Sequence, residues 1–148
     1  MRILSIATVL ACAALAAAPA GSGVAAGASG RPAVIVRTSS YGQILFDGRG
    51  FVLYAFTRDG RGKSRCTGAC AKAWPPYIVT SRPRPAAGVG AARVGTTRRA
   101  DGSLQATYAG RPLYYYVGDR KPGQILCQNV PEFGGVWRVV RLTGSLVG

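Results

Sequence analysis

Cysteine thiols have the widest chemical scope in this chain, and three of its four cysteines lie in its main part: Cys66, Cys70 and Cys127. Three thiolates can hold a soft metal such as Cu(I) or Zn, but the chain has no histidine to supply the usual fourth ligand. The Cys66-x-x-x-Cys70 spacing also differs from the C-x-x-C of thiol oxidoreductases. We therefore predict no metal site and no cofactor, and keep a thiol-based metal-binding or redox protein as the alternative function.

Disulfide formation is the other use of these thiols. A Cys66–Cys70 bridge closes about five residues and stabilises by roughly 2 kcal/mol, whereas a Cys66–Cys127 bridge closes about 62 and stabilises by roughly 4 kcal/mol. The shorter bridge has proximity in its favour but needs a loop or distorted turn, because a regular helix holds residues four apart too widely. The residues alone leave both pairings open.

Two aspartates recur in similar surroundings. Asp59 and Asp119 each follow an aromatic segment by three positions and precede a glycine-containing basic loop. Such an aspartate caps a turn or pairs with an arginine; the functional interpretation is a pair of ligand contacts. Without histidine no Ser-His-Asp or Cys-His set can form. We predict that the protein is not an enzyme and has no catalytic residues.

Aromatic residues at strand spacing surround these aspartates. They form either a core or a platform for carbohydrate or peptide, and core is the more frequent use of such residues. The residues are Tyr54, Phe56, Trp74, Tyr114, Tyr115, Tyr116 and Trp137.

The elements that position these side chains are mostly short strands. Apolar runs typical of strands cover 34–36, 44–46, 51–56, 104–108, 113–117 and 136–140. Asp47-Gly48-Arg49-Gly50 is typical of a hairpin turn. Only Cys70 to Trp74 has a helical pattern, and Pro75-Pro76 ends it after about one turn.

The chain also repeats itself. A shift of 60 residues places Gly42 on Gly102, Ile44 on Leu104, Gly50 on Gly110, and Leu53-Tyr54-x-Phe56-x-x-Asp59 on Leu113-Tyr114-x-Tyr116-x-x-Asp119. One inserted residue brings Cys66 onto Cys127, and two more bring Trp74 onto Trp137.

Apolar residues occupy both faces of the repeated aromatic strands. Tyr54 and Phe56 share one face, and Leu53 and Ala55 share the other. Such strands are covered on both sides. We predict an all-β fold: a single small domain of two pseudo-symmetric β-meander repeats, packed as a sandwich or closed barrel, with a short helical turn near Cys70–Trp74.

The chain resembles the secreted-repeat family of predicted bacterial lipoproteins, which is defined by a Tyr-x-aromatic-x-x-Asp motif. The resemblance is carried by the two repeated aromatic segments and by Cys66-x-x-x-Cys70-Ala71-x-x-Trp74-Pro75-Pro76. The resemblance covers roughly residues 34–144. It implies an exported or envelope-attached protein without an established activity, and it supports the Cys66–Cys70 pairing. Cys127 departs from the family pattern, which has glycine there.

The N-terminus is typical of an export signal. Arg2 precedes an apolar run from Ile3 to Ala18, and small residues follow up to Ala26. Cys12 lies in a segment similar to a lipidation box, but we interpret it as a small apolar residue of the signal. We predict an export signal at 1–26, a flexible lead-in at 27–33, and a β-rich domain at 34–148 with repeats at 34–77 and 96–144 joined by a connection at 78–95.

The chain is strongly basic, with 19 Lys and Arg against five Asp and Glu and a net charge of +14. For a secreted or cell-envelope protein, this balance favours anionic envelope polymers or lipid head groups as partners, and not nucleic acid. We therefore expect a non-enzymatic binding or structural module with a basic surface.

Overall fold

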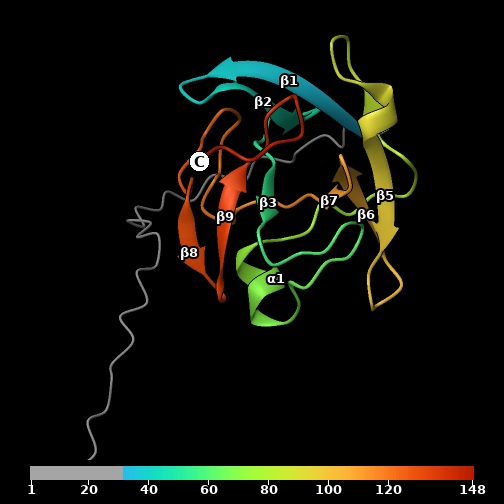
Figure 1. Ribbon diagram of the computed structural model, residues 1–148, viewed down its shortest axis with the longest axis vertical. Coiled ribbons are helices and arrows are strands. Elements are labelled where there is room, and N and C mark those ends of the chain that lie inside the picture. Colours follow the sequence, from blue (N-terminus) through green and yellow to red (C-terminus); the bar gives the residue numbers. More distant parts are fainter. Residues whose placement is uncertain (1–31) are drawn as a thin grey trace, which may run out of the picture.

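The computed structural model describes residues 32–148, whose strands form three small three-stranded sheets (Figure 1). The sheet orders are β2-β1-β4, β3-β9-β8 and β5-β6-β7. The strands are β1 (Ala33–Ser39), β2 (Gly42–Asp47), β3 (Tyr54–Phe56), β4 (Arg84–Pro85), β5 (Val94–Arg98), β6 (Leu104–Tyr108), β7 (Arg111–Pro112), β8 (Val130–Glu132) and β9 (Gly135–Val139). The predicted all-β class is confirmed. None of these three sheets closes on itself, so the closed-barrel form of the prediction is wrong.

Helical structure is confined to two short segments of the described residues: α1 (Ala69–Ala73) and the 3-10 turn η1 (Ala91–Arg93). The helix lies where the sequence predicts it and ends at Ala73, and its C-cap residue Trp74 stands immediately before the two prolines. Within residues 32–148 no helix has the length and apolar character needed to cross a membrane. The predicted export signal, Cys12 and most of the predicted lead-in lie outside the described residues.

The second aromatic segment differs from its prediction as a continuous strand over 113–117. Tyr114 makes isolated bridges to Tyr54 on one side and to Pro76 on the other. The ladder cannot continue beside Pro75 and Pro76, because proline has no N–H to donate. The predicted connection at 78–95 also contains order of its own, since it holds β4, which pairs parallel to β1, and η1.

The two repeats meet at a pair of equivalent tyrosines. The backbone N–H of Tyr54 donates to the carbonyl of Tyr114, and the N–H of Tyr114 donates to the carbonyl of Tyr54, both at 2.9 Å. Such reciprocal bonds between equivalent residues place a local pseudo-twofold axis between them.

Each aromatic segment then pairs with the tryptophan segment of the other repeat. Phe56 lies opposite Trp137 in the β3–β9 ladder. Outside that ladder, the Thr57 N–H donates to the Val136 carbonyl at 3.0 Å. The equivalent bond of the other repeat runs from the Val117 N–H to the Ala73 carbonyl at 3.1 Å. The repeats are therefore interlocked, and neither forms its central sheet alone.

The predicted alignment of the first hairpin of each repeat is wrong by one residue. The Leu53 N–H donates to Leu45, whereas the Leu113 N–H donates to Ala106, both at 3.0 Å. Leu45 thus corresponds to Ala106, and Ile44 corresponds to Gln105 instead of Leu104. The turn before β2 is one residue shorter than the turn before β6, and the turn after β2 is one residue longer than the turn after β6. The two differences cancel, so the aromatic segments that follow are aligned again. A slip of one residue matters because it exchanges the two faces of a strand.

Both faces of the aromatic segments are buried, as the alternating pattern predicts. One core contains Tyr54, Phe56 and Tyr114 together with both tryptophans. The other contains Leu53, Ala55 and Leu113. The two cores lie on opposite sides of the central segments, so substitutions in these segments affect both.

The β8–β9 hairpin has an unfavourable residue in its turn. Its two central residues, Phe133 and Gly134, have φ of 54° and 75°, which is the pattern of a type I′ turn that favours Asn-Gly. A phenylalanine in the left-handed region costs roughly 1 kcal/mol, and the Phe133 side chain is 37% exposed.

We predict that Phe133→Asn stabilises the fold by roughly 1 kcal/mol, because asparagine tolerates this conformation. The free energy of unfolding in urea measures the effect. Gly134→Ala is the matched control and should destabilise, since its Cβ would lie 3.1 Å from Arg58 Nη1 at positive φ. A loss of stability in Phe133→Asn would show that the ring makes more favourable contacts than the strain costs.

Candidate functional site

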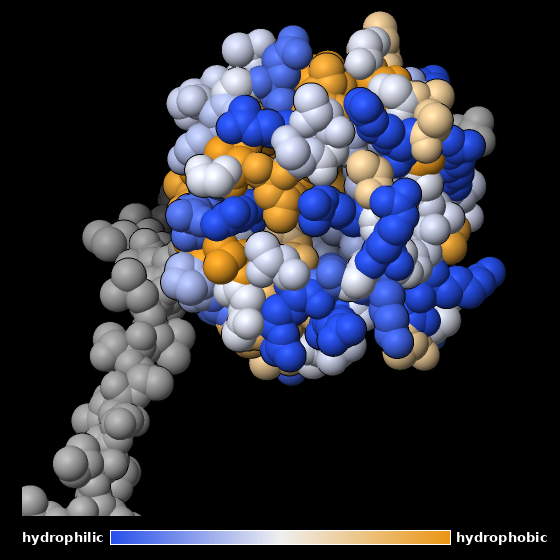
Figure 2. Space-filling view, viewed as in Figure 1, coloured by the Kyte–Doolittle hydropathy of each residue, from blue (hydrophilic) through white to orange (hydrophobic). Residues whose placement is uncertain are grey.

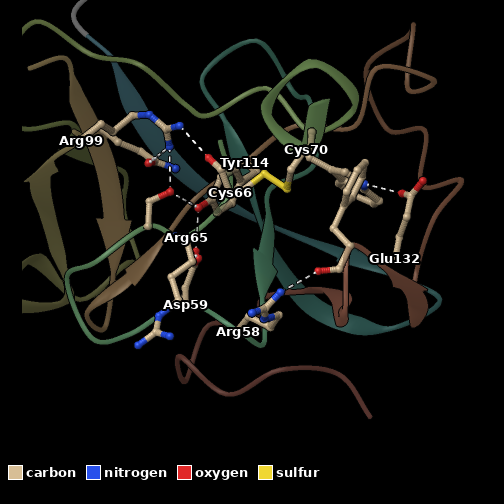
Figure 3. Close-up of a disulfide and its surroundings, with 12 residues drawn as sticks. Arg58, Asp59, Arg65, Cys66, Cys70, Arg99, Tyr114 and Glu132 are labelled. Atoms are coloured by element: carbon tan, nitrogen blue, oxygen red, sulfur yellow. Dashed lines mark hydrogen bonds between the residues drawn. A yellow bond between two sulfur atoms is a disulfide. The ribbon is translucent and has the colours of Figure 1, made fainter. Parts of the chain in front are cut away.

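The repeated tyrosines and aspartates form two crossed pairs. The Tyr54 hydroxyl donates to Asp119 Oδ2 at 2.7 Å, and the Tyr114 hydroxyl donates to Asp59 Oδ2, also at 2.7 Å. The second oxygen of each carboxylate accepts a backbone N–H, from Arg65 for Asp59 at 2.7 Å and from Leu126 for Asp119 at 3.0 Å. Each aspartate therefore orders its own loop and holds the tyrosine of the other repeat. Figure 3 shows the pair of Asp59 and Tyr114.

Burial controls the protonation of these pairs. It raises the pKa of the Asp59 and Asp119 carboxyls, and the hydrogen bonds from the tyrosines oppose this rise. Burial also raises the pKa of the Tyr54 and Tyr114 phenols, and the neighbouring carboxylates raise it further. The phenols consequently stay protonated and act as donors.

The two predicted tryptophans stack on each other at the pseudo-twofold axis. The ring centroids of Trp74 and Trp137 lie 4.2 Å apart and their planes differ by 1°. Phe56 stacks on the outer face of Trp137, and Tyr116 lies tilted against Trp74. Tyr54 and Tyr114 meet Trp74 and Trp137, respectively, edge-on.

The symmetry of this stack is broken at the indole nitrogens. Trp74 Nε1 donates to Glu132 Oε2 at 2.7 Å, whereas Trp137 Nε1 is buried without a hydrogen-bond partner among residues 32–148. Both rings are fully buried, so the stack is interior structure and not a surface platform.

The disulfide joins Cys66 to Cys70, with 5.2 Å between the Cα atoms. Cys66 lies in the loop before α1 and Cys70 lies in the helix, so only one of the two cysteines is helical, as the shorter bridge requires. The alternative Cys66–Cys127 bridge is therefore wrong, because Cys66 is already bonded. Cys127 is fully buried in the core that contains the tryptophans.

An arginine fixes the loop that carries this bridge (Figure 3). Arg99 Nη2 donates to the Cys66 carbonyl at 2.7 Å, and Nη1 donates to Ser64 Oγ and Gln105 Oε1, each at 2.8 Å. Ser64 in turn lies 2.6 Å from the Tyr114 hydroxyl. The network links the bridge loop to one of the crossed pairs.

A groove of about 740 Å³ lies away from these buried residues. The turn after β2, the segment after Trp74 and the start of β1 line it. Its lining residues include Asp47, Arg49, Pro75, Pro76, Tyr77, Ile78, Arg84 and Tyr115. Its lining combines charged groups with aromatic rings.

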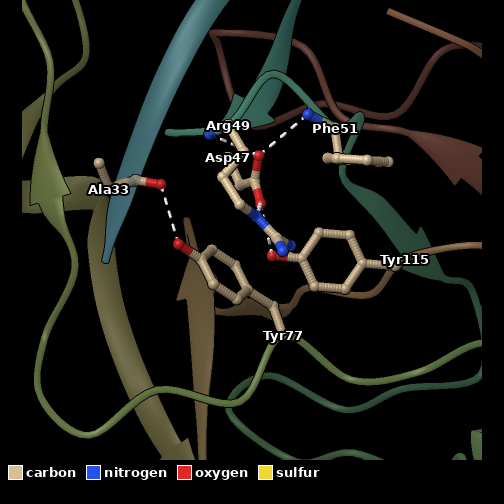
Figure 4. Close-up of polar contacts among 6 residues, drawn as sticks. All are labelled: Ala33, Asp47, Arg49, Phe51, Tyr77 and Tyr115. Carbon is tan, nitrogen blue, oxygen red and sulfur yellow. Dashed lines mark hydrogen bonds and ion pairs between the residues drawn. The ribbon is translucent and has the colours of Figure 1, made fainter. Parts of the chain in front are cut away.

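An ion pair organises one side of this groove (Figure 4). Arg49 Nε donates to Asp47 Oδ2 at 2.9 Å, and the Tyr115 hydroxyl donates to the same oxygen at 3.0 Å. The guanidinium carbon lies 5.1 Å from the Phe51 ring centroid and 5.7 Å from that of Tyr115. The hydrogen bond to Asp47 raises the pKa of Arg49, which therefore stays charged.

Comparison with known families accounts for the repeat. A family model described as a secreted repeat of unknown function matches residues 35–77 and 95–141. This chain belongs to that secreted-repeat family. No curated protein and no solved structure matches the chain.

The motif that the sequence shares between its two copies is thus assembled in the interior of this secreted-repeat protein. The groove residues were missed by sequence reasoning: Asp47 and Arg49 were noted only as a turn, and Tyr77 and Arg84 were not singled out. The described residues include no group of three or more His, Cys, Asp or Glu placed to hold a metal ion.

We predict that Tyr54→Ala destabilises the fold by roughly 3 kcal/mol, because it empties a fully buried ring site. Tyr54→Phe keeps the ring and removes one hydrogen bond to a buried carboxylate, so it should cost about 1–3 kcal/mol. Chemical denaturation measures both. Unchanged stability of the alanine variant would contradict the core role of Tyr54.

We also predict that stability falls as pH rises above about 10, the ordinary phenol pKa. Burial raises the pKa of Tyr54, Tyr114 and Tyr115 in the folded protein, so the unfolded chain loses these protons first and unfolding becomes more favourable. Unfolding free energies at a series of alkaline pH values, with phenolate absorbance, test this. The slope should be shallower in Tyr54→Phe, and phenols that ionise fully while the fold is intact would contradict the prediction.

Proposed function

We propose that this exported secreted-repeat protein is a non-catalytic module that adheres to anionic polymers of the cell envelope through its basic surface. The observation that carries the proposal is the disposition of charge. The chain has 19 Lys and Arg against five Asp and Glu, and one ion pair, Arg49–Asp47, occurs within residues 32–148.

The few acidic groups are engaged in internal contacts. Asp59 and Asp119 accept from tyrosines, and Glu132 accepts from Trp74. Asp47 binds Arg49, and Asp101 accepts from Ser103 in a turn. Because five carboxylates face 19 lysines and arginines, most of the positive charge is unbalanced, and most of these cations are exposed.

The surface itself suits a long, charged partner more than a flat apolar one. Hydrophilic side chains spread over the face in Figure 2, with smaller apolar areas between them. Distributed positive charge attracts a polyanion without a defined pocket, and salt weakens such attraction. A secreted protein meets envelope polymers and lipid head groups before it meets nucleic acid, which supports the choice of partner.

The thiol-based alternative loses support from the disulfide. Cys66 and Cys70 are bonded to each other, so their sulfurs cannot serve as thiolate ligands to a soft metal. Catalysis likewise lacks support, since the chain has no histidine and its conspicuous carboxylates are hydrogen-bonded in the interior.

We predict that the protein binds immobilised polyglucuronate but not neutral dextran, and that binding is lost by about 0.5 M salt as screening shortens to a few ångströms. Replacing the exposed Lys63, Lys72 and Lys121 together by glutamate should weaken retention, while replacing all three by arginine should preserve it. Salt elution profiles measure the effect.

Equal retention on dextran, or retention that resists salt, would rule out electrostatic binding to a polyanion as the function. Vesicles with and without anionic lipid provide the comparison with head groups. If the protein bound anionic vesicles but not polyglucuronate, its partner would be the membrane surface and not a polymer.

A further inference from the structure

The groove contains a guanidinium that is fixed before any ligand arrives. Asp47 holds Arg49 through Nε, and the Phe51 and Tyr115 rings flank it. The side chain is nevertheless 63% exposed, so its terminal nitrogens remain accessible at the rim. A planar guanidinium held in this way is preorganised for bidentate contact with a carboxylate or phosphate.

The Asp47 carboxylate, which pairs with Arg49, has its hydrogen-bond acceptor sites filled from within the chain. Asp47 accepts from the backbone N–H groups of Arg49 and Phe51, from Arg49 Nε and from the Tyr115 hydroxyl. Its charge is balanced by Arg49. Arg84, which also lines the groove and is exposed, then leaves the groove with a net positive charge.

Between these arginines the groove is walled by rings and apolar groups. The Tyr77 and Tyr115 rings lie 5.2 Å apart with planes tilted by 56°, and Pro75, Pro76 and Ile78 line the same space. Aromatic and proline surfaces pack against the apolar faces of a ring, while Thr80 and the arginine groups at the edge suit its polar substituents.

The backbone around the groove is poorly suited to an extended peptide. The N–H groups of Tyr77, Ile78 and Val79 donate to carbonyls of this chain, and Pro75 and Pro76 have none to offer. Strand addition needs unpaired main-chain groups, so recognition must come from side chains: a positive rim and a ring-lined floor.

We infer that the groove binds one anionic sugar unit of an envelope polymer, with its carboxylate or phosphate on Arg49 and Arg84 and its ring against Tyr77 and Tyr115. This inference rests on the proposed function and adds a specific site to the diffuse attraction of the surface. In this arrangement the basic surface attracts the polymer electrostatically, and the groove binds one of its sugar units specifically.

The test uses short probes that the basic surface holds only weakly: a tetramer of hexuronic acid, its methyl ester, and a hexose phosphate. Titrations of the whole mature protein, followed by NMR and calorimetry, are made near physiological ionic strength, about 0.15 M, where distant charges are screened. We expect saturable binding of the tetramer at one site and no binding of the neutral ester. The hexose phosphate shows whether phosphate can replace carboxylate.

Variants locate the site. Arg84→Ala and Arg49→Lys should each weaken the tetramer about tenfold or more, because each removes charge-assisted hydrogen bonds. Ile78→Glu, at a 47% exposed groove position, should weaken it by like-charge repulsion. Arg120→Ala is the matched control, since it removes an exposed arginine that does not line the groove. Thermal unfolding verifies that each variant is folded.

The outcomes separate the two proposals. If the tetramer fails to bind while polyglucuronate still retains the protein, the groove assignment is wrong and the proposed function stands. If Arg120→Ala weakens the tetramer as much as Arg84→Ala, the groove is equally excluded. If neither probe nor polymer binds, both proposals fail. Tighter binding of a proline-rich peptide than of the tetramer would overturn the choice of ligand.

Discussion

The exchange of hydrogen bonds between two equivalent tyrosines is the constraint on which this fold depends. Tyr54 and Tyr114 bond to each other through the backbone and to the opposite repeat's aspartate through the phenol. A single repeat would leave a buried carboxylate without its donor and half of the tryptophan stack uncovered. Because an unsatisfied buried polar group costs about 1–3 kcal/mol, the interlocked pair is the smallest unit that can be stable.

Local patterns carried enough information to predict much of this architecture. Alternation along Leu53–Phe56 placed its side chains on two buried faces, and Pro75-Pro76 ended the helix where expected. The Cys66–Cys70 bridge followed from resemblance to a family, since loop entropy alone favoured the longer bridge. These features depend on residues close together in the sequence, where spacing and chemistry fix the geometry.

Features that depend on distant residues were not accessible in this way. Spacing shows that Asp59 and Asp119 are equivalent. It does not show that each accepts a hydrogen bond from the tyrosine of the other copy, because pairing within one copy would use the same residue types at the same spacing. The one-residue error at Ile44 arose because turns of different length compensate within the hairpins. The groove was missed because Asp47, Tyr77 and Tyr115 come from separate segments with no shared pattern.

The groove lies where the two copies diverge. Tyr115 occupies the position of Ala55 in the first repeat, and by the hydrogen-bond register Asp47 corresponds to Tyr108, whose hydroxyl donates to a backbone carbonyl instead of holding an arginine. The residues that obey the twofold relation, namely the crossed tyrosines, the aspartates and the stacked tryptophans, are buried and hold the repeats together. Around the groove positions that break it, Arg49 and Tyr115 bring charge and aromatic area to the surface. Since a repeated scaffold keeps its stability in the shared positions, the unshared ones are free to differ, and the search for a ligand site belongs there.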